Sequence, residues 1–450
     1  MQLESDAVAA HVAQRLSSSD SNDRHQLSRQ PSRTGPTRLG AMSTLESGTI
    51  PRNELPEPEA APSIDRPAAT HLASKTSAFI AEHVIPVERE VIVDGRIVDD
   101  ALRLDLQRKA KAAGVFGPLS ETRYGGLGLD MRAQALVLEA AGASLLGPLS
   151  VNGSAPDDGN IHLLRDAGTT EQKERYLAPL SAGDTRSAIA MTEPAPGTGS
   201  DPSMLQTTAR QTDSGWVITG DKHFTTGADG ADFIIVVAAT PAGPTMFLVD
   251  HDNPGFQVGR RMPTLDHSIP GGHCEVTFTD CEVAADAVLG EVGKGMLYAG
   301  VRLAPSRLVF CMNWLGLAVR AHEMAARHIV GRSSFGVPIA DHGMAQAHVA
   351  DSEIDIEASR GLIRWAAEII DTQGADSSNA RHSASIAKTF VSEAVWRILD
   401  RSVQLHGGLG VCEDHLVARF LVEARAFRIY EGPSEVLRWS IARRVLRPFR

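Results

Sequence analysis

Near its C-terminus the chain reads Arg428-Ile429-Tyr430-Glu431-Gly432-Pro433-Ser434-Glu435. The Gly432-Pro433 pair predicts the end of one helix and the start of another, because glycine adopts backbone conformations that other residues resist and proline suits a first helical turn. We therefore expect Glu431 in a tight turn between helices, with its N–H outside the helical hydrogen bonds. A carboxylate and a free N–H on one residue could remove a proton and polarise a carbonyl together. A solvated surface glutamate is the ordinary alternative.

Periodic patterns on both sides of this turn predict the fold class. Helical periodicity from Gly295 onward predicts an antiparallel bundle, with segments at 297–330, 344–373, 381–406, 413–429 and 434–446. Before it, short β-branched or aromatic runs separated by Gly, Pro, Asp and Asn are typical of a β-domain; they lie at 216–219, 233–239, 246–249, 256–258 and 275–278. Closer to the N-terminus, helical patterns lie at 70–85, 101–113 and 133–146, and another begins after Thr170, which is a candidate cap.

The sequence thus predicts an α+β fold in three parts. These are an N-terminal helical domain over 67–185, a central β-barrel or sandwich domain over 186–292, and a C-terminal four-helix-bundle domain over 293–450. Residues 1–66 are rich in Ser, Pro, Arg, Asp and Glu and show almost no apolar periodicity, which predicts a disordered tail. Acidic residues in this tail disfavour a transit peptide, and Met42 is a candidate alternative start.

Composition excludes several classes of function. The formal net charge of −11 disfavours sequence-independent binding to nucleic acid, which needs clustered Lys and Arg. The 4 cysteines form no CxxC pair and no cluster with His at metal-binding spacing, so we expect free thiols in a reducing, cytoplasmic setting and no metal. No apolar run approaches the roughly 20 residues of a membrane span. We expect a soluble protein.

Four further stretches could carry chemistry. The loop Ala190–Asp201 contains Thr, Ser and Gly and could present hydroxyls and N–H groups to a polar ring or an anion. The segment Gly220–Gly227 places Phe224 beside two threonines, which suits a conjugated ring, although a core Phe is the ordinary alternative. The stretches 332–336 and 404–410 place an Arg and paired glycines at helix ends, where they could bind phosphate or be simple helix caps.

In this order, from about residue 70 to 446, these motifs resemble the acyl-CoA dehydrogenase family. The motifs are Thr-Glu-Pro…Gly-Ser-Asp, Gly-x-Lys…Thr, Arg-x-x-Phe-Gly, Gln-x-x-Gly-Gly-x-Gly and Tyr-Glu-Gly. The similarity is closest to the branch found in eukaryotes fused behind a kinase-like domain. Two segments carry that similarity, Ser154–Asn160 and Arg302–Leu308.

The resemblance implies FAD held between the β-domain and the bundle, in a homodimer or homotetramer. Residues implied on the flavin and pyrophosphate are Met191, Thr192, Gly199 and Ser200, with Phe224 and Thr226 at the isoalloxazine edge. Residues implied to contact FAD of a partner chain are Arg332, Phe335, Gln404, Gly407 and Gly408. Tyr430, Gly432 and Arg307 are implied beside the substrate.

The resemblance also implies the chemistry. Glu431 matches the base that removes the pro-R α-proton of an acyl-CoA or acyl-carrier thioester while the β-hydride goes to flavin N5. A trans-2-enoyl thioester forms, and electrons pass to an electron-transfer flavoprotein. Some members take their base from the first bundle helix, at the position of Ser306, and a serine cannot serve there.

The sequence departs from the family pattern at several positions. The loop after Pro194 is about two residues longer than usual, and Phe224 stands where Trp is usual. Gly343 and Pro433 replace a Gln and a Thr that bind the cofactor, so weaker FAD retention is expected. The kinase-fused branch commonly has Asp at the position of Glu431. The alternatives are an oxidase or monooxygenase of the same fold that uses O₂, and a DNA-associated flavoprotein of the alkylation-response type.

Overall fold

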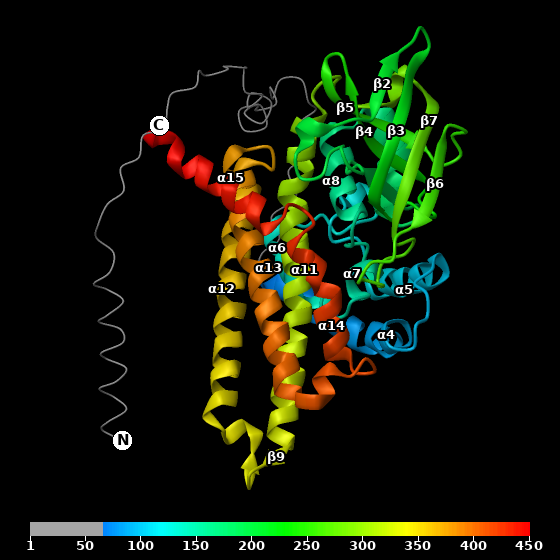
Figure 1. Ribbon diagram of the computed structural model, residues 1–450. Coiled ribbons are helices and arrows are strands. Elements are labelled where there is room, and N and C mark those ends of the chain that lie inside the picture. The colour runs from blue at the N-terminus through cyan, green and yellow to red at the C-terminus, as the bar shows by residue number, and fades with distance from the viewer. Residues whose placement is uncertain (1–65) are drawn as a thin grey trace, which may run out of the picture. The chain divides into compact units, whose positions relative to one another are not determined.

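A computed structural model describes residues 66–450, so the tail predicted over 1–66 lies outside the described residues except for its last position. Helices come first, a sheet follows, and helices close the chain (Figure 1), which confirms the predicted fold class. The N-terminal elements are α3 (Arg66–Phe79), the π-helical turn η1 (Ile80–Val84), α4 (Ile85–Ile92), α5 (Asp100–Ala113), η2 (Thr122–Tyr124), α6 (Met131–Ala141), α7 (Gly147–Ser150), α8 (Asp157–Ala167), α9 (Thr170–Gln172), η3 (Lys173–Leu177) and α10 (Ala178–Ala182).

Two local predictions in this region were wrong. The helix predicted over 133–146 ends at Ala141, where α6 meets the first bundle helix so closely that a Cβ on Gly142 would stand 2.0 Å from the carbonyl oxygen of Asn313. The cap is Thr169 and not Thr170: its hydroxyl accepts from the N–H of Gln172 (3.2 Å), whose side chain accepts from the N–H of Thr169 (3.1 Å). This reciprocal pair is a capping box.

The central sheet is 8-stranded, with the order β6-β7-β3-β2-β4-β5-β8 and β1 paired in parallel with β4. Its strands are β1 (Ser187–Ala190), β2 (Thr208–Gln211), β3 (Gly215–Thr226), β4 (Phe233–Thr240), β5 (Gly243–Asp250), β6 (Phe256–Arg261), β7 (His273–Ala284) and β8 (Val288–Leu289). In β4, alternate side chains pack into two different cores, one shared with α8 and the start of the bundle and one within the β-domain. Burial on both faces explains its unbroken apolar sequence.

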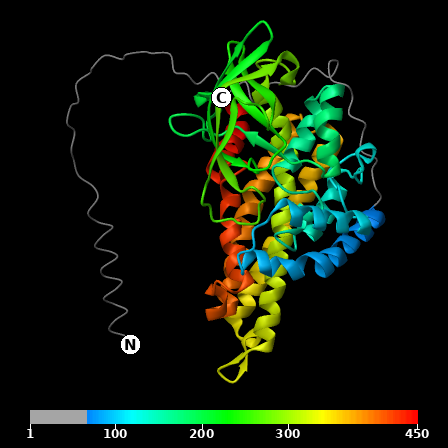
Figure 2. The ribbon, with the colours of Figure 1, turned by 90° about the vertical axis from the view of Figure 1, so that its right-hand side faces the viewer.

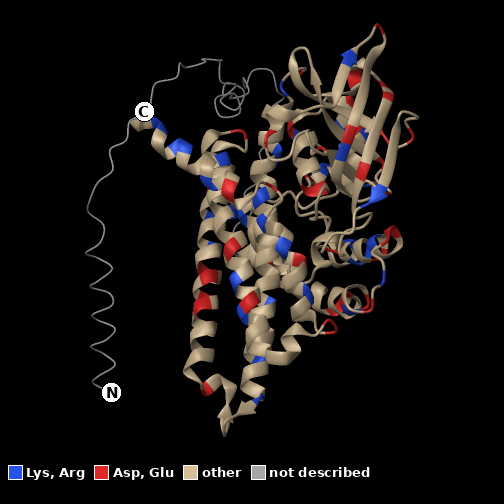
Figure 3. Ribbon diagram, viewed as in Figure 1, with Lys and Arg blue, Asp and Glu red and all other residues tan. Residues whose placement is uncertain are grey.

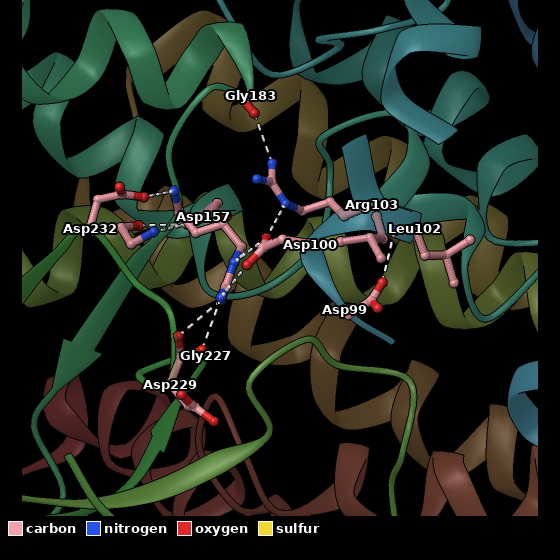
Figure 4. A network of polar contacts seen from close by, with 12 residues as sticks. Asp99, Asp100, Leu102, Arg103, Asp157, Gly183, Gly227, Asp229 and Asp232 are labelled. Atoms are coloured by element: carbon pink, nitrogen blue, oxygen red, sulfur yellow. Dashed lines mark hydrogen bonds and ion pairs between the residues drawn. The ribbon is translucent and has the colours of Figure 1, made fainter. Parts of the chain in front are cut away.

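A partly buried polar network fastens the N-terminal helices to the sheet (Figure 4). Arg186, just before β1, binds Asp100 at the start of α5 through Nε (2.9 Å) and the carbonyl oxygens of Gly227 and Asp229 through its terminal nitrogens. Beside it, the carboxylate of Asp157 on α8 accepts from the N–H of Ser187 at 2.9 Å. These contacts fix the ends of β1 and β3, the two strands that lead into the candidate cofactor loops.

The C-terminal region is dominated by three long antiparallel helices (Figures 1 and 2). The elements are α11 (Gly295–Gly331), the hairpin β9 (Ser333–Ser334) and β10 (Val337–Pro338), η6 (Ile339–Asp341), α12 (Gly343–Gln373), α13 (Ser378–His406), η7 (Gly407–Val411), α14 (Leu416–Ala424), η8 (Arg425–Arg428), α15 (Ser434–Leu446) and η9 (Arg447–Phe449). The β9–β10 hairpin lies at the end of the bundle opposite the β-domain (Figure 1). The helix predicted over 413–429 is shorter than expected because its last turn is a 3₁₀ turn leading to Glu431.

A buried ion pair also fastens the N-terminal helices to the bundle. Arg320 on α11 contacts the fully buried carboxylate of Glu88 on α4 at 2.6 Å, and the hydroxyl of Ser144 donates to the other oxygen at 2.8 Å. Elsewhere, acidic and basic residues intersperse along the bundle and the sheet (Figure 3). Among the helices of residues 66–450, none is long and apolar enough to cross a membrane.

Candidate active site

The β-domain and the bundle enclose between them a large pocket of about 1170 Å³. Its wall includes residues from β1 and β3, the loop 263–270, the helices α11 and α13, and the turn before α15. The predicted site residues found in this wall are Met191, Thr192, Gly199, Ser200, Phe224, Thr226, Arg307, Tyr430, Glu431 and Gly432. One cavity therefore brings together the predicted flavin, substrate and base residues of a single chain.

Glu431 occupies a turn with an unusual backbone. Its φ is 55°, a left-handed conformation that costs a residue with a side chain roughly 1 kcal/mol or more. Buried cations hold the turn in place: Arg307 Nε donates to the carbonyl oxygen of Glu431 (2.8 Å), and the fully buried Lys388 Nζ donates to that of Gly432 (2.7 Å). Burial lowers the pKa of Arg307 from its usual value and that of Lys388 to about 8. These contacts fix the turn.

The carboxylate of Glu431 is largely buried, with 12% of its side chain exposed. Its Oε1 accepts from Arg302 Nη1 at 3.2 Å, and its Oε2 is buried with no hydrogen-bond partner among the described residues. Within residues 66–450 the N–H of Glu431 donates to no backbone carbonyl. The turn therefore offers an acceptor oxygen and a donor N–H to whatever occupies the pocket.

Aromatic side chains from α11 and the preceding 3₁₀ turn surround Tyr430. Its ring lies 4.8 Å from that of Phe310 and 5.8 Å from that of Phe427, and its hydroxyl accepts from the indole N–H of Trp314. Burial raises the pKa of Tyr430 well above its usual value. Because Phe310, Trp314 and Tyr430 also line the pocket, this wall suits an apolar chain.

On the sheet side, Phe224 stands with φ at 52° and its side chain 48% exposed at the pocket wall. A large aromatic residue exposed in a strained conformation presents a flat surface to the cavity. Hydroxyls of Thr192, Ser200 and Thr226 line the same wall, and a Cβ added to Gly199 would meet no atom within 4 Å. An aromatic surface bordered by hydroxyls and open backbone fits a planar, polar-edged ring such as a flavin.

A chain of hydrogen bonds that the sequence did not predict continues from Thr226. Its hydroxyl is 2.9 Å from Nδ1 of His273, whose Nε2 is 2.8 Å from the carboxylate of Asp266. Burial would raise the pKa of Asp266, but the hydrogen bond and charge of His273 keep it below the usual value. Nearby, burial raises the pKa of Glu423 to about 7, although Glu423 accepts from the N–H of His267 and the hydroxyl of Ser268.

The loop after Met191 is supported from beneath by a buried ion pair. Lys222 Nζ contacts Glu193 Oε1 at 2.9 Å, and the N–H groups of Thr198, Gln206 and Thr207 also donate to this carboxylate. Burial alone would raise the pKa of Glu193, but the Lys222 hydrogen bond and the backbone donors lower it to about 2. Glu193 is thus a structural carboxylate that fixes the loop carrying Gly199 and Ser200.

The remaining predicted residues lie outside this pocket. Arg332 and Phe335 are exposed near the β9–β10 hairpin, with Phe335 96% exposed, and Gln404, Gly407 and Gly408 are exposed at the end of α13. Thirty residues of helix separate Arg302 from Arg332, a span of about 45 Å. These five residues cannot reach the pocket of their own chain, so a role on FAD requires a second chain.

Sequence reasoning also missed the groups that surround the carboxylate of Glu431. Arg302 is one of them, and Asp158 and Asn160 on α8 stand behind it. The signal was present, because both segments that carried the branch resemblance, 154–160 and 302–308, contribute to this cluster. Their proximity could not be inferred from their separation in sequence.

Family comparisons agree with this three-part fold and pocket. Models of the acyl-CoA dehydrogenase N-terminal, middle and C-terminal domains match residues 67–184, 188–281 and 293–446. The chain belongs to the acyl-CoA dehydrogenase family, whose members are FAD-dependent oxidoreductases.

Among its relatives is the probable acyl-CoA dehydrogenase FadE2 of Mycobacterium tuberculosis, 34% identical, with 82% of this chain and 93% of the relative covered. Mouse acyl-CoA dehydrogenase family member 10, of the kinase-fused branch, is also 34% identical over 85% of this chain, which spans only 37% of that protein. The (R)-benzylsuccinyl-CoA dehydrogenase of Thauera aromatica is 31% identical, with 84% and 95% covered.

Solved structures show the same fold. A putative acyl-CoA dehydrogenase from Mycobacterium abscessus is 34% identical, with a TM-score of 0.78 and with 85% of this chain and 99% of that chain covered. Butyryl-CoA dehydrogenase from Megasphaera elsdenii is 29% identical, with a TM-score of 0.75 and coverage of 84% and 98%.

Proposed function

We propose that this protein oxidises an acyl-CoA thioester to the trans-2-enoyl-CoA, with Glu431 as the base. One observation carries the proposal: Glu431, whose largely buried carboxylate keeps one oxygen without a hydrogen-bond partner among the described residues, lines the same pocket as the candidate flavin residues. A solvated carboxylate would be too weak a base for an α-proton, whereas a buried one with a free oxygen can accept it. FAD, when bound, would take the hydride and pass the electrons on, for which we propose an electron-transfer flavoprotein.

Residues of this chain would also make the α-proton more acidic. The N–H of Glu431 would donate to the thioester carbonyl, where negative charge develops as the proton leaves. Arg307 and Lys388 fix the carbonyls of residues 431 and 432, so the N–H keeps its direction. Ser306 would take no part in proton removal, because its hydroxyl already donates to the carboxylate of Asp158 at 2.7 Å.

The pocket also suits a CoA thioester at its polar end. On or just after α15, Arg443, Arg444 and Arg447 line the cavity, as does Arg381 at the start of α13. Guanidinium groups are the preferred partners of phosphates. These arginines would bind the phosphates of CoA, while the aromatic wall near Tyr430 would hold the acyl chain.

The test is an anaerobic titration of the FAD-loaded protein with a panel of acyl-CoAs, followed at the oxidised flavin band near about 450 nm. We expect at least one thioester to bleach this band. Glu431→Gln should slow bleaching by about a thousandfold or more while still binding the thioester. Glu435→Gln is a matched control, since Glu435 is exposed on the next helical turn and does not line the pocket.

Two outcomes would contradict the proposal. If no thioester bleaches the bound flavin, the proposed oxidation of an acyl-CoA is wrong, and rapid reoxidation with O₂ consumption would favour an oxidase. If Glu431→Gln bleaches as fast as the Glu435→Gln control, another group removes the proton.

A further inference from the structure

The two segments that carry the branch resemblance meet directly behind Glu431. Arg302 on α11 donates through Nη1 to Glu431 Oε1 (3.2 Å) and through Nε to the side-chain oxygen of Asn160 on α8 (3.1 Å). Ser306, one turn further along α11, donates to Asp158 at 2.7 Å. The hydrogen bonds between α8 and α11 thus continue through Arg302 to the carboxylate of Glu431, which we propose as the base.

The cluster is built tightly and away from water. Asp158, Asn160 and Ser306 are fully buried, and only 6% of the Arg302 side chain is exposed. Gly159 leaves room for the guanidinium, because a Cβ there would stand 2.6 Å from the Cζ of Arg302. Any other residue at 159 would displace Arg302, so α8 is shaped to receive this side chain.

Charge in the cluster is unevenly matched. One cation, Arg302, faces the two carboxylates of Glu431 and Asp158, and Asp158 Oδ1 is buried without a hydrogen-bond partner among the described residues. Burial and the charge of Glu431 raise the pKa of Asp158 to about 6, although Arg302 and Ser306 act to lower it. With both carboxylates ionised the cluster carries a net charge of −1, and it becomes neutral when Glu431 takes a proton.

Other charged groups face the cluster from neighbouring elements. Lys388 on α13 and Arg307 on α11 act on Glu431 from the backbone side of the turn. His162 lies one turn along α8, and its burial lowers its pKa well below the usual value, so it adds no charge near neutral pH. Among these groups, Arg302 is the one that contacts the carboxylate of Glu431 itself, and the charges of Glu431 and Asp158 act on each other.

We propose that Arg302 and Asp158 are positioning residues that set the orientation and basicity of Glu431. Arg302 holds the carboxylate ionised, with its free oxygen toward the substrate. The negative charge of Asp158 opposes the effect of Arg302, so that Glu431 can still accept the α-proton. Once Glu431 is neutral, Asp158 remains as the counter-ion of Arg302. Asn160 holds Arg302 in position, and Ser306 holds Asp158. The inference rests on the proposed role of Glu431 as base.

The two residues have opposite expected effects, which a purely structural role would not produce. Removing the guanidinium should make Glu431 easier to protonate, because a nearby opposite charge favours the ionised form of a carboxyl group. Removing the charge of Asp158 should make Glu431 harder to protonate and therefore a weaker base.

The experiment is an infrared pH titration of the FAD-loaded protein, which follows the carbonyl stretch of protonated carboxyl groups and needs no turnover. Difference spectra of Glu431→Gln and Asp158→Asn assign the two bands. We then compare the Glu431 band in wild type, Arg302→Gln, Arg302→Lys and Asp158→Asn. Arg108→Gln is the control for loss of one positive charge, because Arg108 lies on the exposed face of α5.

We expect Arg302→Gln to shift the Glu431 titration upward, Arg302→Lys to restore most of the wild-type position, and Asp158→Asn to shift it downward. Where acyl-CoA oxidation is observed, the acid limb of the kcat/KM profile should move in the same directions. If Arg302→Gln fails to fold, Asp158→Asn still tests the downward shift. A Glu431 band that moves no more in Asp158→Asn, and in Arg302→Gln where it folds, than in Arg108→Gln overturns the inference.

The titration separates this inference from the proposed function. If no thioester bleaches the flavin but the Glu431 band shifts as expected, the charge cluster stands and the proposed reaction falls. If bleaching requires Glu431 but the band does not respond to Arg302 or Asp158, the reaction stands and the cluster is only structural.

Discussion

The buried pair of Lys222 and Glu193 allows a quantitative test of how the candidate flavin loop is held. Their charged atoms are 2.9 Å apart, and the two side chains are only 0% and 2% exposed. Replacing Lys222 by Met leaves the Glu193 carboxylate buried without its cation, a change that usually costs about 3–5 kcal/mol. Three backbone N–H groups still donate to Glu193, so we expect a loss near the lower end, about 3 kcal/mol.

That loss should appear in cofactor binding, because Glu193 anchors the loop of Gly199 and Ser200 at the pocket wall. If the loop must be reordered to bind FAD, about 3 kcal/mol corresponds to roughly a hundredfold weaker binding. The assay is FAD binding to the deflavinated protein, followed by quenching of flavin fluorescence, together with the thermal unfolding midpoint. We expect both to fall in Lys222→Met.

A double-mutant cycle shows whether the pair itself is responsible. Lys222→Met with Glu193→Gln removes both charges, so its loss should be clearly smaller than the sum of the two single losses. The exposed pair of Lys294 and Glu291 is the matched control, with 2.6 Å between charged atoms and side chains 41% and 44% exposed. Such a pair contributes little, so Lys294→Met should leave FAD binding unchanged. Additive losses at Lys222 and Glu193, or less than threefold weaker FAD binding in Lys222→Met, would refute the reasoning.

Three further predictions follow from the site. The pKa of Glu423 in the folded protein, about 7, lies above its value in the unfolded chain. The contribution of Glu423 to stability is therefore full below about pH 4.5 and is lost as the pH rises to 7. Between these pH values, the thermal midpoint of Glu423→Gln should fall less than that of the wild type. Loss of the His273–Thr226 hydrogen bond in His273→Ala should weaken FAD binding about fivefold, and Thr226→Val should add little to that loss; additive effects would contradict it. Replacing Arg443 and Arg447 by Gln should raise KM for an acyl-CoA but not for the same acyl group on pantetheine; equal increases would exclude contacts with the CoA phosphates.

Local sequence patterns were sufficient to predict the order of the elements and the turn at Glu431. Apolar spacing fixed the long helices of the bundle to within a few residues, because burial of one face is a local requirement. The turn was predictable from Gly432 and Pro433, since their conformational preferences act over two or three residues. The error at 133–146 arose where α6 meets α11, a tertiary contact that the apolar pattern does not record.

The environment of the turn was not predictable in the same way. The φ of Glu431 depends on cations from α11 and α13, which no local pattern connects to residue 431. The hydrogen bond between Arg302 and Asn160 spans 142 residues, and Asp266 lies in a loop without regular structure between β6 and β7. The family resemblance was enough to name the expected site residues. The charged groups that contact those residues could be identified only from the three-dimensional structure.

The length of α11 has a consequence for mixed populations of this protein. Its first half carries Arg302 and Arg307 beside the pocket, while Arg332 lies at its far end, where we expect it to serve the FAD of another copy. Each active site would then contain Glu431 of one chain and Arg332 of another, so substitutions at these two residues would disable different parts of the site. Co-assembly of one chain of each kind would regenerate one intact site and one doubly defective site. Two inactive alleles could therefore complement each other within one gene.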